Sequence, residues 1–174
     1  SPGIDVRFAY EGYRDFADLK EGQKYYTIDF ETDLDLFKSK LDEIKAIGGG
    51  DDAEDVAGGL NAGLNMNWRS NARYAILIAD APGHGNQYHD AEVQDDYGNG
   101  DPNGLDLEDL MKKYVENNIN LCLTRIDNYT DTMYKKLMLT FIKESKLSKN
   151  KPEIQLVEYC WRSGILVRLR SKEL

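Results

Sequence analysis

The sequence predicts an α/β fold built around an open, mostly parallel sheet. Segments with the hydrophobic pattern of strands alternate with segments of helical periodicity along most of the 174 residues. The segment Tyr74–Asp80, YAILIAD, is apolar until its last residue, which is typical of a strand covered on both faces. No internal repeat or linker composition interrupts the pattern, so we expect one domain over residues 1–174.

The first half of the chain is expected to open with two strands, Ile4–Tyr10 and Lys24–Phe30, joined by a turn over Ala17–Gln23. Thr32 is a candidate N-cap for a helix that ends at the glycine run Gly48–Gly50. Its apolar stripe would consist of Leu34, Phe37, Leu41 and Ile44.

A second helix is expected to begin near Ala53, because apolar residues recur every four positions after it. After the strand YAILIAD, a polar loop covers Ala81–Leu105. Asp106 and Thr130 are candidate N-caps of two further helices. The remaining expected strands are Ile119–Ile126, Ile154–Trp161 and, as a further candidate, Gly164–Arg170.

The charge balance restricts the class of partner. The chain has 31 acidic and 22 basic residues and a formal net charge of −9, which disfavours nucleic acid and anionic membranes and favours a divalent cation. Two cysteines do not make a disulfide framework, and no apolar stretch has membrane-spanning length. We therefore expect an intracellular, cytoplasmic protein.

Acidic residues stand where the carboxyl edge of the sheet is expected. Asp80 ends the most apolar strand, and the pair Asp51–Asp52 follows three glycines. In open α/β sheets ligands bind at this edge, and carboxylate oxygens suit Mg²⁺. Two interpretations of GGGDD stay open: one acid caps the next helix, or the loop folds over a cation.

Other motifs are weaker. His84 and His89 are expected to be surface-loop histidines, because a zinc site would need further ligands of defined geometry. The stretch His89–Asp106 is rich in acids but lacks EF-hand spacing, so we expect a solvated loop, with metal contact as the less favoured alternative. Neither a phosphate-binding glycine loop nor a Gly-x-Ser-x-Gly nucleophile elbow is present.

Three stretches, GGGDDAEDVAGGL, NWRSNARYAILIADAPGHG and GLDLEDL, together resemble the von Willebrand factor A (VWA) domain. The resemblance is closer to the version found beside alpha-type protein kinases. It covers Ile4–Phe141, whereas residues 146–174 diverge. It implies a doubly wound, Rossmann-like sheet with helices on both faces. It also implies a non-catalytic protein-binding module with a metal-ion-dependent adhesion site for Mg²⁺ at the carboxyl edge of the sheet.

The resemblance assigns the metal-site residues one by one. Asp80 matches the aspartate that follows the family's fourth strand, and Asp52 stands where a threonine hydroxyl is usual. Asp51 is a further metal candidate, and Gly50 and His84 are binding-edge candidates. The extra carboxylate of Asp52 would disfavour an acidic partner group at the open coordination position of the metal.

The family's first strand and its Asp-x-Ser-x-Ser motif are absent from these residues. We therefore expect an N-terminally incomplete domain with a weak Mg²⁺ site and no central strand. Three ways to cover the exposed strand edges stay open: the chain is a fragment, another molecule supplies a strand by self-association or partner binding, or a terminal run such as GILVRLR inserts. The functional alternatives to a binding module are a metal-assisted hydrolase and a scaffold domain completed by a foreign strand.

Overall fold

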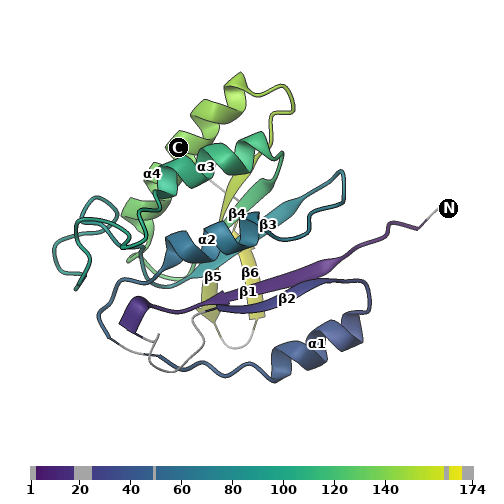
Figure 1. Cartoon of the computed structure of the whole chain (residues 1–174), viewed down its shortest axis with the longest axis horizontal. Helices are drawn as coiled ribbons and strands as arrows, with labels where there is room; N and C mark the ends of the chain where they lie inside the picture. Colours follow the sequence, from purple (N-terminus) through teal and green to yellow (C-terminus); the bar gives the residue numbers. More distant parts are fainter. Residues whose placement is uncertain (1–2, 18–24, 49, 163–164, 170–174) are drawn as a thin grey trace.

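The strands of the computed structural model form two separate sheets (Figure 1). The structure describes residues 3–17, 25–48, 50–162 and 165–169, with only the backbone of residues 159–162 and 165–169. In the first sheet β1 (Phe8–Tyr13) pairs antiparallel with β2 (Tyr25–Glu31).

The second sheet has the strand order β3-β4-β5-β6, in which the first three strands are parallel and β6 runs antiparallel to β5. This parallel arrangement agrees with the predicted α/β class. The four strands are β3 (Tyr74–Ala79), β4 (Asn120–Arg125), β5 (Ile154–Arg162) and β6 (Ile165–Leu169).

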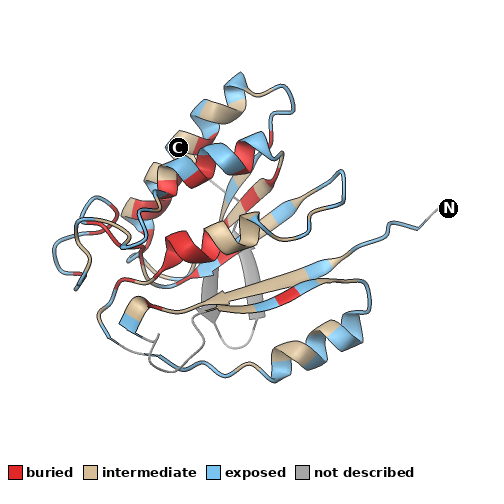
Figure 2. Cartoon of the chain, in the orientation of Figure 1, coloured by how far each residue is buried: buried red, intermediate tan, exposed pale blue. Residues whose placement is uncertain are grey.

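Of the four helices in the described residues, three build the core with one face of the second sheet. In Figure 1, α3 and α4 lie together beside β3 and β4, whereas α1 lies next to β2 at the other end of the molecule. Figure 2 shows the buried residues concentrated in α2, α3 and α4, and α1 buries none. The helices are α1 (Leu34–Asp42), α2 (Val56–Leu64), α3 (Leu107–Glu116) and α4 (Asp131–Leu147).

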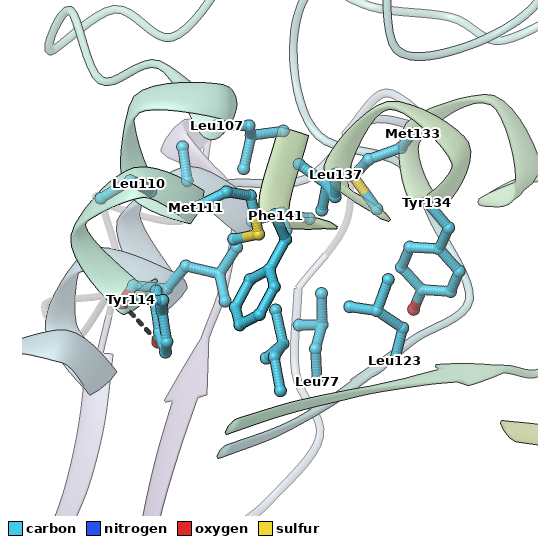
Figure 3. Packing of buried hydrophobic residues seen from close by; sticks show 14 of the residues in the cluster. Leu77, Leu107, Leu110, Met111, Tyr114, Leu123, Met133, Tyr134, Leu137 and Phe141 are labelled. Carbon is cyan, nitrogen blue, oxygen red and sulfur yellow. Dashed lines mark hydrogen bonds between the residues drawn. The ribbon is translucent and has the colours of Figure 1, made fainter. Parts of the chain in front are cut away.

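Alternate residues of β3 and β4 face these helices. Leu77 and Leu123 pack beneath Met111, Leu137 and Phe141 in one continuous cluster (Figure 3). The hydroxyl of Tyr114 donates a hydrogen bond of 2.9 Å to the carbonyl of Leu60, which joins α3 to α2 inside this core. Period-two alternation therefore decides which residues of the apolar strands become core.

The expectation that YAILIAD is covered on both faces is wrong. Tyr74, Ile76 and Ile78 are 71%, 63% and 65% exposed. Among the described residues only β4 pairs with β3, and the helices that contribute to the core cover its Leu77 face. The other face of β3 is therefore an apolar surface without a covering layer.

The N-terminal predictions are correct in kind and displaced in position. β1 begins at Phe8, four residues later than expected, and Ile4 and Val6 before it are exposed. Asp33, not Thr32, caps α1 by accepting hydrogen bonds from the Asp35 and Leu36 amides. α1 ends at Asp42, before the glycine run, and its apolar stripe is not buried. The expected turn falls mainly on residues 18–24, outside the described residues.

The capping interpretation of GGGDD is also wrong, because α2 begins later. Asp55 caps this helix, and its Oδ1 accepts a hydrogen bond of 2.8 Å from the Gly58 amide. Gly58 and Gly59 let α2 approach the first sheet, since a Cβ at either would overlap Tyr25 or Tyr13. Asp51 and Asp52 are left outside the helix for another role.

The second half of the chain follows the prediction closely. Asp106 caps α3 through a 2.8 Å hydrogen bond from the Asp109 amide, whereas Thr130 occupies the N-cap position of α4 without a side-chain capping bond. The run GILVRLR does not insert beside β3, because Ile165–Leu169 pairs with β5 on the far side of the sheet. Among the described helices, none has the length and apolar character required to cross a bilayer.

Candidate functional site

Two loops meet at the carboxyl end of β3. The loop before α2 joins the loop after β3 through hydrogen bonds from the Glu54 amide to the Pro82 carbonyl, 2.9 Å, and from the Asp52 amide to the Gln94 carbonyl, 3.0 Å. Glu54 and Gly83 form an isolated parallel bridge at the same place. The two acid-bearing segments that the sequence assigned to one edge are therefore neighbours.

The two aspartates of GGGDD accept backbone hydrogen bonds from the loop that follows β3. The Asp51 carboxylate accepts a hydrogen bond of 2.5 Å from the Asp96 amide, and that of Asp52 accepts one of 3.0 Å from the Gln94 amide. Each uses its Oδ2 atom. The Oδ1 atom of Asp51 is buried and has no hydrogen-bond partner among the described residues. These residues therefore leave one carboxylate oxygen of Asp51 available.

His84 lies between two carboxylates. Its Nε2 is 2.7 Å from Asp15 Oδ1 and its Nδ1 is 2.9 Å from Asp95 Oδ1, and the three side chains are 1%, 5% and 2% exposed. Because an ionised carboxylate only accepts hydrogen bonds, both ring nitrogens must donate, which favours the imidazolium. Burial lowers the pKa of His84, but the hydrogen bonds and charges of Asp95 and Asp15 outweigh it and raise the pKa.

Asp95 is the centre of this network. Besides His84, its carboxylate contacts His89 Nε2 at 3.0 Å and accepts hydrogen bonds of 2.8 Å from the amides of Gly85 and Tyr97. Burial would raise the pKa of this carboxyl group, yet these donors together lower it to about 2. Asp95 is therefore ionised at any ordinary pH.

Aromatic rings enclose the imidazole. The ring centroids of Phe16 and Tyr97 lie 5.5 Å and 5.0 Å from that of His84. Gly50 lies near this network, with a φ of +143°, and a Cβ there would come within 3.3 Å of the Ala17 side chain and 3.8 Å of Asp15 Oδ2. Gly50, one of the binding-edge candidates, thus lets the acidic loop lie close to the segment that follows β1.

Three residues of this network lie close enough together to hold a metal ion. Asp51, His84 and Asp95 each offer one ligand atom, and these atoms lie within 4.8 Å of one another. Within the described part of the chain, neither Asp52 nor Asp80 belongs to this group. Asp80 is exposed at the end of β3. The residues could hold a metal ion, and of the three predicted ligands the group includes Asp51.

Two expectations about this region are wrong. His84 and His89 are buried, 5% and 7% exposed, rather than surface-loop residues. The stretch after His89 is not a freely solvated loop, because Val93 is buried and Asp95 binds both histidines. Sequence reasoning missed Asp15 and Asp95. The sequence gives one local signal for Asp95: it lies six positions after His89. The loop that contains both has more acidic residues than the caps of its neighbouring helices require.

A second acidic group contains Asp55, the N-cap residue of α2, and Asp101. The Tyr25 hydroxyl donates a hydrogen bond of 2.5 Å to Asp55 Oδ2. Asp101 lies close to Asp55, and its Oδ1 accepts hydrogen bonds from the Asn103 and Leu105 amides. Burial raises the pKa of Asp101, the Leu105 hydrogen bond opposes the rise, and the Asp55 carboxylate adds to it.

Comparison with known proteins identifies a relative by sequence. No family model matches the chain. Over 154 residues the chain is 38% identical to a protein named Alpha-protein kinase vwkA, from Dictyostelium discoideum. The match includes 87% of this chain and 23% of the relative. The chain thus spans less than a quarter of the length of the curated relative that it matches, and the kinase name describes that whole protein.

Proposed function

We propose that the chain is a non-catalytic protein-interaction module of VWA type, which binds a partner at the carboxyl edge of its parallel sheet. One observation carries the proposal: the loop before α2, which holds Asp51 and Asp52, is joined at that edge to the loop after β3, which begins with Asp80. The relative's name adds that such a module would accompany an alpha-protein kinase, and we propose that it positions the kinase on a protein partner.

We further propose that Mg²⁺ binds at this edge through Asp80 and Asp52. Asp80 is exposed and Asp52 uses only one oxygen on the Gln94 amide, so both have carboxylate oxygens to offer a hard cation. The site would be weak, because the chain lacks the Asp-x-Ser-x-Ser ligands. A neutral or cationic partner group is favoured over an acidic one.

The hydrolase alternative receives little support. A general base needs a ring nitrogen that can reach substrate, and both nitrogens of His84 contact buried carboxylates. This supports a module without catalysis. Turnover of p-nitrophenyl phosphate in Mg²⁺ that disappears in His84→Ala, with the variant still folded, would overturn the proposal.

The cation part is tested by titrating ¹⁵N-labelled chain with Mg²⁺. We expect saturable shifts of the amides around Asp52 and Asp80, their loss in Asp80→Asn, and their retention in Asp42→Asn, a matched exposed acid at the end of α1. Unchanged spectra of the wild type at millimolar Mg²⁺ would remove the cation. Affinity capture with the wild type and the same two variants tests partner binding. If the captured partner is retained equally by Asp80→Asn and after chelation of the metal, it does not bind through this site.

A second candidate function is a self-associating scaffold. The exposed Tyr74, Ile76 and Ile78 lie on a strand that, among the described residues, pairs on one side only. An apolar face beside an unpaired edge is a template for another strand, and a second copy of the chain offers the same edge.

Sedimentation velocity over a range of concentrations tests this candidate. We expect a dimer that the double variant Ile76→Lys, Ile78→Lys converts to a monomer, while Leu139→Lys, on an exposed position of α4, leaves it intact. A wild type that stays monomeric at high concentration would contradict the scaffold.

A further inference from the structure

We propose that Asp51, His84 and Asp95 form a binding site for a transition-metal ion of the Zn²⁺ class, separate from the Mg²⁺ edge at Asp80. This inference does not rest on the proposed function. It rests on the kind of ligand atoms, their burial and the groups behind them.

The ligand set selects the metal. Mg²⁺ and Ca²⁺ are bound by oxygen ligands, whereas an imidazole nitrogen with carboxylates suits Zn²⁺ and its first-row neighbours. His84 supplies the nitrogen, and Asp51 and Asp95 supply the oxygens. Three protein ligands leave a fourth tetrahedral position for water or for a group of another molecule.

The position is nearly dry. The His84 and Asp95 side chains are 1% and 2% exposed, and Asp51 Oδ1 is buried with no hydrogen-bond partner in the part of the chain that the structure describes. A buried carboxylate oxygen without a donor is costly, and a bound cation would satisfy it. This orphaned atom is the observation that separates a metal site from a network of charged side chains alone.

The distances require only small movements: the 2.9 Å between His84 Nδ1 and Asp95 Oδ1 would lengthen slightly, and Asp51 would move closer. Bonds of about 2.0–2.2 Å to one tetrahedral ion would bring the ligand atoms to about 3.4 Å from one another. They now lie within 4.8 Å. Asp51 is the half-exposed member and is held by one backbone hydrogen bond from Asp96, so its side chain can supply most of this movement.

A carboxylate contacts the ring nitrogen of His84 that would not bind the metal. A metal-bound histidine usually donates its other N–H to a carboxylate, which fixes its tautomer and orientation. Asp95 is itself one of the ligands and contacts Nδ1, so Nδ1 is the ligating nitrogen and Nε2 keeps its contact of 2.7 Å with Asp15. His89 orients Asp95 by contacting its second oxygen at 3.0 Å.

Zn²⁺ competition with a chromophoric zinc indicator tests the proposal, using the untagged chain after chelation and desalting. The chain has two histidines, both in this network, so other imidazoles do not compete. We expect one equivalent of Zn²⁺ to bind, and Co²⁺ to give visible absorption bands without a thiolate charge-transfer band.

Asp51→Asn and Asp52→Asn are matched variants, since each acid accepts one backbone hydrogen bond from the same loop. We expect Asp51→Asn to weaken Zn²⁺ binding at least about tenfold and Asp52→Asn to leave it unchanged. Asp80→Asn should also leave it unchanged, which distinguishes this site from the Mg²⁺ edge.

Two results would overturn the proposal: no competition with the indicator at equimolar Zn²⁺, or equal affinity of Asp51→Asn and Asp52→Asn. His84→Gln should abolish binding, and circular dichroism shows whether that variant is folded. Because Asp51 lies at the rim of the network, Asp51→Asn keeps the test decisive if His84→Gln does not fold.

Discussion

The imidazole of His84 contacts the carboxylate of Asp15 at 2.7 Å, although 69 positions separate them in the sequence. Asp15 follows β1, and His84 lies in the loop after β3, so this contact joins the segment leaving one sheet to the segment leaving the other. Such a contact stabilises the arrangement of the two sheets as well as the histidine itself.

Removal of Asp15 should therefore be costly. Asp15→Ala leaves a buried imidazolium with one carboxylate partner fewer, and breaking a buried pair in this way typically costs about 3–5 kcal/mol. Urea unfolding followed by circular dichroism measures the loss. Asp42→Ala, an exposed acid at the end of α1, should change the unfolding free energy by less than about 0.5 kcal/mol. A loss below about 1 kcal/mol for Asp15→Ala would show that the contact is not stabilising.

The packing of α2 against β1 depends on a glycine. A Cβ at Gly59 would overlap the Tyr13 ring, so Gly59→Ala should separate the helix from the first sheet and cost about 1–3 kcal/mol. Gly63 on the same helix is the control, because its nearest neighbour is the Tyr114 hydroxyl at 3.3 Å. There the gain of about 1 kcal/mol in helix propensity offsets the tight contact. Equal thermal midpoints for the two variants would contradict this account of the interface.

Adjacent residues of β3 should respond very differently to truncation. Leu77 is 6% exposed and packs under Phe141, so Leu77→Ala should cost about 2–5 kcal/mol in chemical denaturation. Ile76 is 63% exposed, and Ile76→Ala should cost less than about 1 kcal/mol. Similar losses at both positions would mean that another layer covers the Ile76 face in solution.

The same strand shows what a sequence can and cannot predict. The apolar run and its closing acid place β3 almost to the residue, because hydrophobic pattern and length decide a strand. They cannot tell whether one face or both are covered, since that depends on which other elements pack there. The sequence therefore predicts Ile76 and Ile78 as core residues, whereas the structure places them on the surface.

Among the helix caps and the residues of the candidate site, some follow from the local sequence and others depend on tertiary contacts. Asp106 was predicted as a cap because a helical stripe starts directly after it, whereas the acid-rich GGGDDAED offers several caps and the structure uses Asp55. His84 and His89 looked like loop residues because their partners are distant or unmarked: Asp15 comes from the first sheet and Asp95 from an irregular loop. Local periodicity carries no information about such tertiary contacts.

Asp101 supplies a pH-dependent prediction that is independent of both metal proposals. Its pKa is raised above 3.8, chiefly by burial and also by Asp55, so its ionised form is disfavoured in the folded chain. The contribution of Asp101 to folding is then most favourable below pH 3.8 and is lost as the pH rises through its folded-state pKa. At neutral pH the ionised side chain costs stability.

Asp101→Asn removes this cost and keeps the oxygen that accepts from the Asn103 and Leu105 amides. We expect it to raise the unfolding free energy at pH 7, and the gain to shrink as the pH falls. Asp101→Ala is the control: it also loses the two backbone hydrogen bonds and should be less stable than Asp101→Asn at every pH. Urea unfolding at pH 5, 6 and 7 measures the trend, and a gain for Asp101→Asn that is absent or independent of pH would show that the Asp101 carboxylate is accommodated without cost.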